Sequence, residues 1–201
     1  MKQKNYFIHQ TAIADEGSQI GEGTKIWHFS HLMPNAVVGK NCQLGQNVFI
    51  DNNAVIENGV KIQNNVSVYN GVVIENDVFI GPSVVFTNVI NPRSFINRKA
   101  EFKNTRVCEG STIGANSTII CGIKIGEYAF VGAGTVVTKD VKSFALVIGN
   151  PGKQKGWVCK RGNKLIFNEE NIAVGLNGEK YKLENNIVYL VDNSFKEEGA
   201  V

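Results

Sequence analysis

A large apolar residue recurs at every sixth position through most of this 201-residue chain, and that period restricts the fold more than any other feature. An amphipathic helix repeats near 3.6 residues and a half-buried strand near 2.0, so a period of six indicates strands interrupted at a fixed place. Such a period is typical of a repeat protein. The positions are Ile8, Ala14, Ile20, Ile26, Leu32, Val38, Leu44, Ile50, Ile56, Ile62, Val68, Ile74, Ile80 and Phe86, then Val107, Ile113, Ile119, Ile125, Val131 and Val137.

Each early hexad also has a small or β-branched residue four positions after the large one. These residues are Ala12, Ser18, Thr24, Ser30, Ala36, Cys42, Val48, Ala54, Val60, Val66, Val72 and Val78. One large and one small inward position describe a short strand that lines a narrow interior. Gly, Asn and Asp between the strands tolerate left-handed backbone, so each hexad should end in a corner. Three strands and three corners would close a triangular coil of about 18 residues.

Residues 92–106, with the sequence PRSFINRKAEFKNTR, break the pattern and are predicted to leave the prism as a loop. Long loops in compact domains are usually functional, and this one is basic and aromatic; the alternative is a solvated insertion. After Val141 the chain is expected to end the coil, with Pro151 and Gly152 sending it across one side. We therefore predict a β-helix domain over residues 1–148, and an exit segment with a β cap over residues 149–201 that covers the open end.

Composition excludes several classes of protein. A formal net charge of +3 argues against a nucleic-acid partner but is compatible with a small phosphate-bearing ligand. The sequence has no apolar run long enough to span a membrane and its start lacks the apolar core of a signal peptide, so we expect a cytoplasmic protein without a membrane partner. The four cysteines show no paired spacing and are expected to be free thiols.

Several segments, among them IWHFSH, LGQNVFI, VKIQNNVSVY, DVFIGPSVVFTNVINPRS, GANSTIICG, GEYAFVGAGTVVTKDV and FALVIGNPGKQKGW, resemble the bacterial sugar N-acetyltransferases of the hexapeptide family. The nearest resemblance is to enzymes that acetylate UDP-2-acetamido-3-amino-2,3-dideoxy-D-glucuronate in O-antigen synthesis. It implies an all-β fold, a left-handed parallel β-helix of about seven coils. It also implies acetyl-CoA as co-substrate, a nucleotide-linked amino sugar as acceptor, and a homotrimer with sites between subunits. Relatives carry a four-cysteine zinc site in the tail, where only Cys159 remains here, so we expect no metal.

The 18-residue register places candidate acceptor residues on this scaffold. Asp51, Tyr69 and Thr87 should form one outward column, with Asn52, Asn70 and Asn88 in the corner column beside it, just before the loop. The resemblance implies that Asn88 holds the sugar amine for attack on the thioester; the alternative is a turn residue. Tyr69, with the preceding Lys61 and Asn64, is a candidate for contact with the nucleotide, and Thr87 for contact with the acceptor substrate. Arg93 and Arg98 are candidates for the diphosphate or a sugar carboxylate, because a guanidinium group binds both in a bidentate way. Surface packing and solvated charge are the alternatives for these residues.

A general base is not obvious in the sequence. His28 and His31 are the available candidates, but they lie in the first coils and we interpret them as structural. The loop contains no histidine, which favours catalysis by positioning, with the departing CoA thiolate taking the proton. A sugar amine beside electron-withdrawing groups is less basic than a lysine, so part of it is neutral near pH 7.

Acetyl-CoA is expected along the C-terminal coils. Small residues such as Ala115 and Ala133 would let the pantetheine arm approach, and Lys139 and Lys153 would meet the phosphates. The alternative is that these are ordinary repeat residues and surface lysines.

Three other functions remain open on the sequence alone. One is acetylation of a dTDP-3-amino-3,6-dideoxyhexose. Another is a γ-type carbonic anhydrase, for which His9 and His28, 19 residues apart, would lie on one face in adjacent coils. A third is a filament-forming scaffold, which would need neither the basic loop nor the exit segment.

Overall fold

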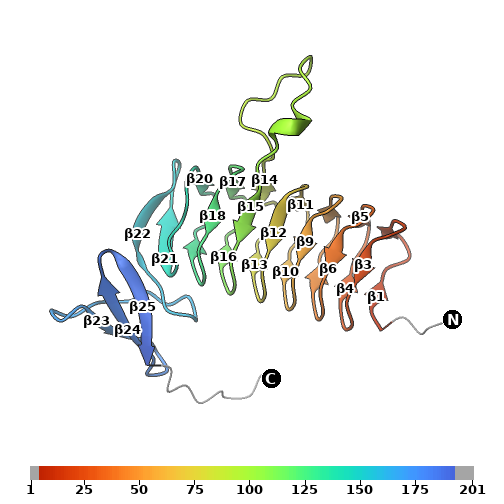
Figure 1. Cartoon of the computed structure of the whole chain (residues 1–201). Coiled ribbons are helices and arrows are strands. Elements are labelled where there is room, and N and C mark those ends of the chain that lie inside the picture. Colours follow the sequence, from red (N-terminus) through yellow and green to blue (C-terminus); the bar gives the residue numbers. More distant parts are fainter. Residues whose placement is uncertain (1–4, 193–201) are drawn as a thin grey trace.

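The computed structural model describes residues 5–192, which form a three-sided, left-handed parallel β-helix with one projecting loop and a small C-terminal sheet (Figure 1). Sheet 1 has the order β1 (Phe7–Ile8), β4 (Lys25–Ile26), β7 (Gln43–Leu44), β10 (Lys61–Ile62), β13 (Phe79–Ile80), β16 (Thr112–Ile113), β19 (Phe130–Val131), β21 (Ala145–Ile148) and β22 (Lys153–Trp157). Sheet 2 has the order β2 (Ile13–Ala14), β5 (His31–Leu32), β8 (Phe49–Ile50), β11 (Ser67–Val68), β14 (Val85–Phe86), β17 (Thr118–Ile119) and β20 (Val136–Val137). Sheet 3 has the order β3 (Gln19–Ile20), β6 (Val37–Val38), β9 (Val55–Ile56), β12 (Val72–Ile74), β15 (Thr105–Val107) and β18 (Lys124–Ile125). The predicted fold class is confirmed.

The strand register confirms the 18-residue coil. Phe7 pairs with Lys25, and Lys61 pairs with Phe79. Across the loop the separation becomes 33 residues, because Val85 pairs with Thr118, so the insertion adds 15 residues to one coil. The loop leaves the corner between sheets 2 and 3, after β14, and contains one 3-10 turn, η1 (Lys99–Glu101).

The C-terminal boundary of the loop differs from the prediction. Thr105 and Arg106, assigned to the loop over residues 92–106, belong to β15. Arg106 pairs with Val73 on one side and Lys124 on the other, and its side chain faces outward to Glu75. Arg106 lies on a strand with a neighbour on each side, but its side chain faces outward. Only inward-facing positions follow the hexad pattern, so the sequence of this strand could not be distinguished from that of a loop.

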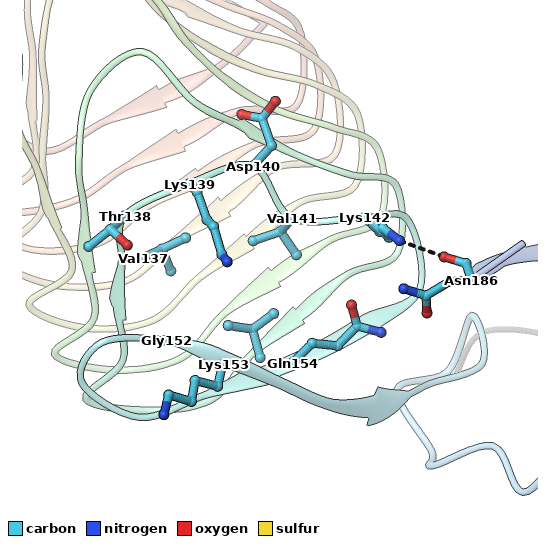
Figure 2. Close-up of a pocket in the computed structure, with 11 residues that line it drawn as sticks. Val137, Thr138, Lys139, Asp140, Val141, Lys142, Gly152, Lys153, Gln154 and Asn186 are labelled. Atoms are coloured by element: carbon cyan, nitrogen blue, oxygen red, sulfur yellow. Dashed lines mark hydrogen bonds between the residues drawn. The ribbon is translucent and has the colours of Figure 1, made fainter.

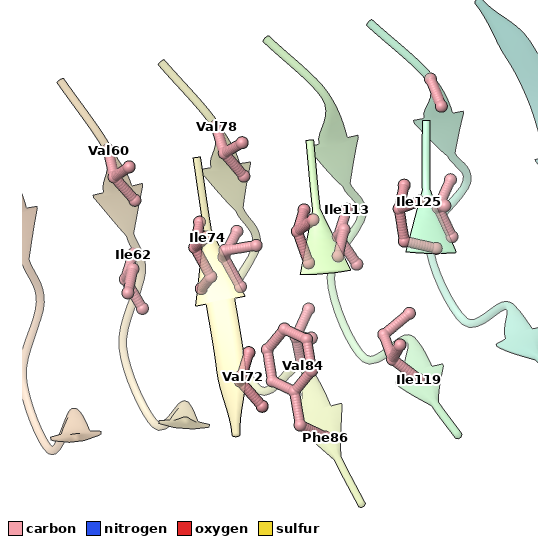
Figure 3. Packing of buried hydrophobic residues seen from close by; sticks show 14 of the residues in the cluster. Val60, Ile62, Val72, Ile74, Val78, Val84, Phe86, Ile113, Ile119 and Ile125 are labelled. Carbon is pink, nitrogen blue, oxygen red and sulfur yellow. The ribbon is translucent and has the colours of Figure 1, made fainter. Parts of the chain in front are cut away.

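The prism interior holds the predicted large and small positions in stacked layers (Figure 3). Ile62, Ile80 and Ile113 are at most 1% exposed, and the small positions Thr24 and Cys42 are fully buried. Ala14, the one small residue in the large series, is exposed in the first coil. Burial of each large aliphatic side chain stabilises the fold by about 1.5–3 kcal/mol, so the repeat itself provides the core.

The corners adopt the left-handed backbone that their sequence predicts. Positive φ values recur at six-residue intervals, at Gly17, Gly23, Phe29, Asn35, Asn41, Asn47, Asn53, Gly59, Asn65, Gly71, Asp77 and Ser83. Phe29 and, in the later coils, Tyr128 are bulky exceptions at this position, where Gly, Asn and Asp are favoured.

The C-terminal segment packs against the end of the prism. After β21 the chain reverses and β22 pairs antiparallel with it. A three-stranded antiparallel sheet follows, made of β23 (Ile172–Val174), β24 (Lys180–Glu184) and β25 (Ile187–Asp192). Tyr181 of this sheet is fully buried and meets Phe144 of the last coil edge-on, with ring centroids 5.6 Å apart. The C-terminal sheet is therefore packed against the last coil.

All four cysteines are buried free thiols, as predicted. Burial raises the pKa of the Cys42 thiol above its ordinary value, which keeps it protonated and unreactive. Within residues 5–192 no helix has the length and apolarity needed to cross a bilayer.

Candidate functional site

The corner between sheets 2 and 3 carries the central predicted residues Tyr69, Thr87 and Asn88. Thr87 Oγ1 accepts the backbone N–H of Cys121 at 2.9 Å, and the Asn88 carbonyl accepts the N–H of Lys103 at 3.0 Å. These two bonds tie the next coil and the returning end of the loop to the same corner. The Tyr69 ring meets Phe49 edge-on, so part of its surface packs as the alternative interpretation expected.

The side chain of Asn88 behaves differently from the asparagines that stabilise corners. Asn47 donates to Asn65 Oδ1 in the next coil, and Asn58 accepts the backbone N–H of Lys40. Within residues 5–192 the Asn88 side-chain amide makes no hydrogen bond, and its backbone is not left-handed. Its amide is therefore available to a ligand, a property that it shares with its column neighbours Asn52 and Asn70.

The loop forms a cavity of about 540 Å³ beside this corner, lined by residues that include Arg93, Phe95, Arg98 and Phe102. The Arg98 Nη1 atom donates to both carboxylate oxygens of Glu101, at 2.7 and 2.8 Å. Its Nε atom is buried and has no partner within the described residues. Arg93 donates to the Pro92 carbonyl at 2.8 Å. The loop that begins directly after this corner thus carries two guanidinium groups and exposed aromatic surface.

A second cavity, of about 440 Å³, lies at the C-terminal end of the prism between the last coil and the start of β22 (Figure 2). Both lysines predicted for the CoA phosphates, Lys139 and Lys153, line it, together with Lys142 and Asn186, which sequence reasoning missed. The Asp140 carboxylate accepts the N–H of Lys124 at 2.8 Å and points away from the Lys139 ammonium (Figure 2). Three lysines line this cavity, although the Lys153 ammonium points outward in Figure 2, and its one carboxylate is occupied; this charge balance is suited to a polyanion.

One edge of the C-terminal cavity lies on the corner that carries Asn88. Asn88 is followed at the same corner by Cys121 and then by Lys139, since Val85 pairs with Thr118 and Thr118 with Val136. Asn88 and Lys139 are therefore two coils apart, about 10 Å along the axis.

Other predicted residues lie on a different corner of the same chain. Ala115 and Ala133 occupy the corner between sheets 1 and 2, where the Ala115 carbonyl accepts the N–H of Gly134. Asn64 lies at that corner too, in the coils before them, and Lys61 lies on the outer face of sheet 1. Within one chain the whole width of sheet 2 separates these residues from Asn88.

A smaller cavity, of about 320 Å³, has Asn64 in its lining. It combines aromatic and amide side chains, and its lining is Trp27, His28, Gln43, Gly45, Gln46, Ile62, Gln63 and Asn64. Of these only His28 and Asn64 were singled out in the sequence, and Asn64 Oδ1 is occupied by the backbone N–H of Gln46.

The histidines do not approach the loop. His28 stacks on His9 with ring centroids 3.6 Å apart, which confirms that the two lie in adjacent coils. His31 bonds Asp15 at 2.9 Å, three coils or about 14 Å along the axis from Asn88. Within residues 5–192 no three His, Cys, Asp or Glu side chains gather as metal ligands would. Within one chain neither His28 nor His31 lies at the height of Asn88.

Comparison with known proteins adds independent findings. The family model described as "Bacterial transferase hexapeptide (six repeats)" matches residues 17–52, 53–88 and 104–139, more than half of the chain. A dTDP-3-amino-3,6-dideoxy-alpha-D-galactopyranose 3-N-acetyltransferase of Aneurinibacillus thermoaerophilus is 52% identical over 182 residues, which are 90% of this chain and 93% of that protein.

Two other matches have lower sequence identity and cover less of the two chains. The bifunctional protein GlmU of Thermotoga petrophila is 29% identical over 147 residues, which are 72% of this chain and only 23% of GlmU. Among solved structures, the acetyltransferase domain of PglB from Neisseria gonorrhoeae FA1090 in complex with acetyl coenzyme A is 23% identical, with a TM-score of 0.49 over 75% of this chain and 57% of that one. That similarity is too low to support a functional comparison.

Proposed function

We propose that this chain, which belongs to the bacterial transferase hexapeptide family, transfers the acetyl group of acetyl-CoA to the 3-amino group of a dTDP-linked 3-amino-3,6-dideoxyhexose. The observation that carries the proposal is the 52% identity, over 93% of its length, to a protein named for this reaction. The enzyme is an N-acetyltransferase, and the free amide of Asn88 beside a basic loop supplies a site for its acceptor.

Of the two acceptor sugars considered from the sequence, the observations favour the dTDP-linked 3-amino-3,6-dideoxyhexose. The sequence resemblance favours a UDP-linked 3-amino uronate, whose carboxylate Arg93 and Arg98 could bind. Arg98 is already paired with Glu101, so a sugar carboxylate would compete with an internal one. The diphosphate, which both nucleotide sugars share, is enough to explain the basic loop. The relative's name points to the dTDP-linked deoxysugar.

Asn88 is proposed as the residue that positions the amine. Its side-chain oxygen accepts one N–H of the sugar amine and directs the nitrogen lone pair at the thioester carbonyl. A C–N bond forms, the C–S bond breaks, and the amine proton passes to the departing CoA thiolate. The reaction needs no histidine, which agrees with the distance of His31 from this corner.

Acetyl-CoA is proposed to follow the corner between sheets 2 and 3 away from the loop. Its thioester lies at Asn88, and its phosphates reach Lys139 and Lys153 at the end of the prism. The pantetheine arm and diphosphate are long enough to cover the two coils between them.

A homotrimer with sites between subunits would complete this arrangement. Ala115, Ala133 and Asn64 lie on the corner between sheets 1 and 2, whereas Asn88 and Lys139 lie on the corner between sheets 2 and 3. Two such corners can face each other only if they come from different copies of the chain. A threefold assembly gives every copy both roles.

The proposal is tested by measuring thiol release from acetyl-CoA with the dTDP-linked 3-amino-3,6-dideoxygalactose and, separately, with the UDP-linked 3-amino uronate. We expect turnover of the dTDP sugar, with kcat lowered about 100-fold in Asn88→Ala, because misplacing a reacting group by about 1 Å costs this much. Asn58→Ala, on the corner between sheets 3 and 1, is the matched control and should keep wild-type kcat. Turnover of the uronate alone would reassign the acceptor, and an unchanged kcat in Asn88→Ala would remove its positioning role.

A further inference from the structure

We propose that the C-terminal sheet is part of the acetyl-CoA site, and that its β24–β25 turn holds Lys142 as the ligand of the 3′-phosphate of CoA. This inference rests on the proposed function, and it gives the appendage a role beyond covering the end of the prism.

The contact that carries the inference joins residues 44 positions apart. The Lys142 Nζ atom donates to the backbone carbonyl of Asn186 at 2.8 Å (Figure 2). Asn186 belongs to the turn between β24 and β25, and both it and Lys142 line the 440 Å³ cavity together with Lys139 and Lys153. The β24–β25 turn of the C-terminal sheet therefore contributes Asn186 to the lining of the cavity in which the phosphates of acetyl-CoA are proposed to bind.

The position of the turn is fixed rather than adaptable. Asn185 and Asn186 have φ values of 49° and 57° and join strands whose ends pair Glu184 with Ile187, as in a two-residue hairpin turn. The sheet behind the turn is anchored by Tyr181, which is fully buried and whose hydroxyl accepts the N–H of Lys160 at 3.0 Å. The Asn186 carbonyl is thus presented to the cavity by a rigid support.

The hydrogen-bonding capacity of Lys142 leaves room for a phosphate. An ammonium group has three donors, of which the Asn186 carbonyl takes one, so two remain for phosphate oxygens. A lysine held in place loses less side-chain entropy when a ligand binds than a free one does. In Figure 2 Lys142 lies on the side of the cavity next to the C-terminal sheet, apart from Lys153. Lys139 and Lys153 are assigned to the diphosphate of CoA, and Lys142 is assigned to its 3′-phosphate.

The test compares the Kd of CoA with that of 3′-dephospho-CoA by titration calorimetry, in wild type and in Lys142→Gln. We expect CoA to bind about tenfold more weakly to Lys142→Gln, which corresponds to about 1.4 kcal/mol, and 3′-dephospho-CoA to bind both proteins within twofold. Lys155→Gln is the matched control, since Lys155 lies on β22 but outside the lining of the cavity. An equal loss for both ligands, or no loss for CoA, would overturn the assignment.

The role of the turn is tested separately. Asn186→Gly keeps a positive φ and the carbonyl, and should bind CoA as wild type does. Asn186→Pro cannot adopt φ 57° and should weaken CoA binding as Lys142→Gln does, with no further loss in the double variant. Near-ultraviolet dichroism of Tyr181 and its neighbours reports whether the sheet remains packed. Additive losses in the double variant would contradict the inference. CoA binding without sugar acetylation would contradict the proposed acceptor alone.

Discussion

Replacement of Gly114 by alanine tests whether close contact between successive coils, rather than backbone conformation, requires glycine at the inter-sheet corners. A Cβ at Gly114 would lie 2.5 Å from the backbone nitrogen of Ala133 and 2.8 Å from its Cα atom. Ordinary contact begins near 3.4 Å, so the coils would have to separate by about 0.9 Å. The obstructing atoms belong to the backbone, which cannot rotate away as a side chain would.

The cost follows from the hydrogen bonds that span this gap. Gly114 donates to the Val131 carbonyl and Gly134 to the Ala115 carbonyl, each at 2.8 Å. A separation of about 0.9 Å would lengthen both to about 3.7 Å, beyond hydrogen-bonding range. Two lost bonds at about 1 kcal/mol each, added to an overpacking cost of about 1–3 kcal/mol, give a destabilisation of about 3–5 kcal/mol. For a chain of this length the Tm should fall by about 10 °C.

Gly134→Ala provides the matched comparison, because Gly134 has a left-handed backbone and free space for a Cβ, whereas Gly114 has neither. Gly134 has a φ of +68° and no atom within 4 Å of the position that a Cβ would occupy, so alanine there meets strain without collision. Left-handed backbone costs a non-glycine residue about 1–2 kcal/mol. Calorimetric scans of both variants at one protein concentration should therefore place Gly114→Ala well below Gly134→Ala. Equal Tm values, or the reverse order, would refute contact between coils as the reason for Gly114.

Two pH predictions follow from groups with shifted pKa values. Burial raises the pKa of Glu75, but the backbone N–H of Glu109 and the Arg106 guanidinium outweigh burial and hold that pKa below its ordinary 4.5. The ionised Glu75 carboxylate therefore stabilises the fold above pH 4.5, and this stabilisation is lost as the pH falls further. Arg106→Gln should weaken this acid dependence in urea unfolding between about pH 3 and pH 7, and an unaltered profile would exclude the ion pair as its cause. Burial raises the pKa of Tyr181 from 10.0 to about 12, so its stabilisation is complete below pH 10 and is lost as the pH rises towards 12. Burial also raises the pKa of Tyr128 to about 12, so absorbance at the phenolate band should show two late-titrating tyrosines, of which Tyr181→Phe removes one; an unchanged late amplitude in that variant would contradict the assignment.

The architecture could be predicted because every coil repeats the same physical requirement. Each hexad needs one large and one small inward residue and a left-handed corner, so the coil length is encoded again in each successive hexad. The loop could be located for the same reason, as a failure of the pattern after Phe86. Its end was misplaced because Arg106 points outward, and outward positions are not constrained by the interior.

The candidate site was only partly predictable. Asn88 and Lys139 could be placed on one corner from the register alone, since repeat arithmetic converts sequence separation into height. Lys142 and Asn186 could not be paired in this way, because their contact depends on how the chain after β21 folds back, where no repeat exists. The division of Ala115 and Asn88 between two corners also follows from the register. Small side-chain size, which selected Ala115 as a candidate, does not by itself distinguish one corner from another.

The position of the loop explains how a uniform stack acquires a chemical centre. Every coil offers the same corner, and only the insertion after β14, the fifth of the seven strands of sheet 2, distinguishes one height from the others. In the proposed arrangement the coils before the loop bind the nucleotide sugar, and the coils after it lead to the lysine cavity proposed for the CoA phosphates. The two proposed substrates, a nucleotide sugar and acetyl-CoA, are both long and must meet at their reactive ends. Such a scaffold suits them, because they can extend along the prism axis in opposite directions from the loop. The β24–β25 turn of the C-terminal sheet lies where the repeat ends, and it therefore marks the far end of the proposed CoA site.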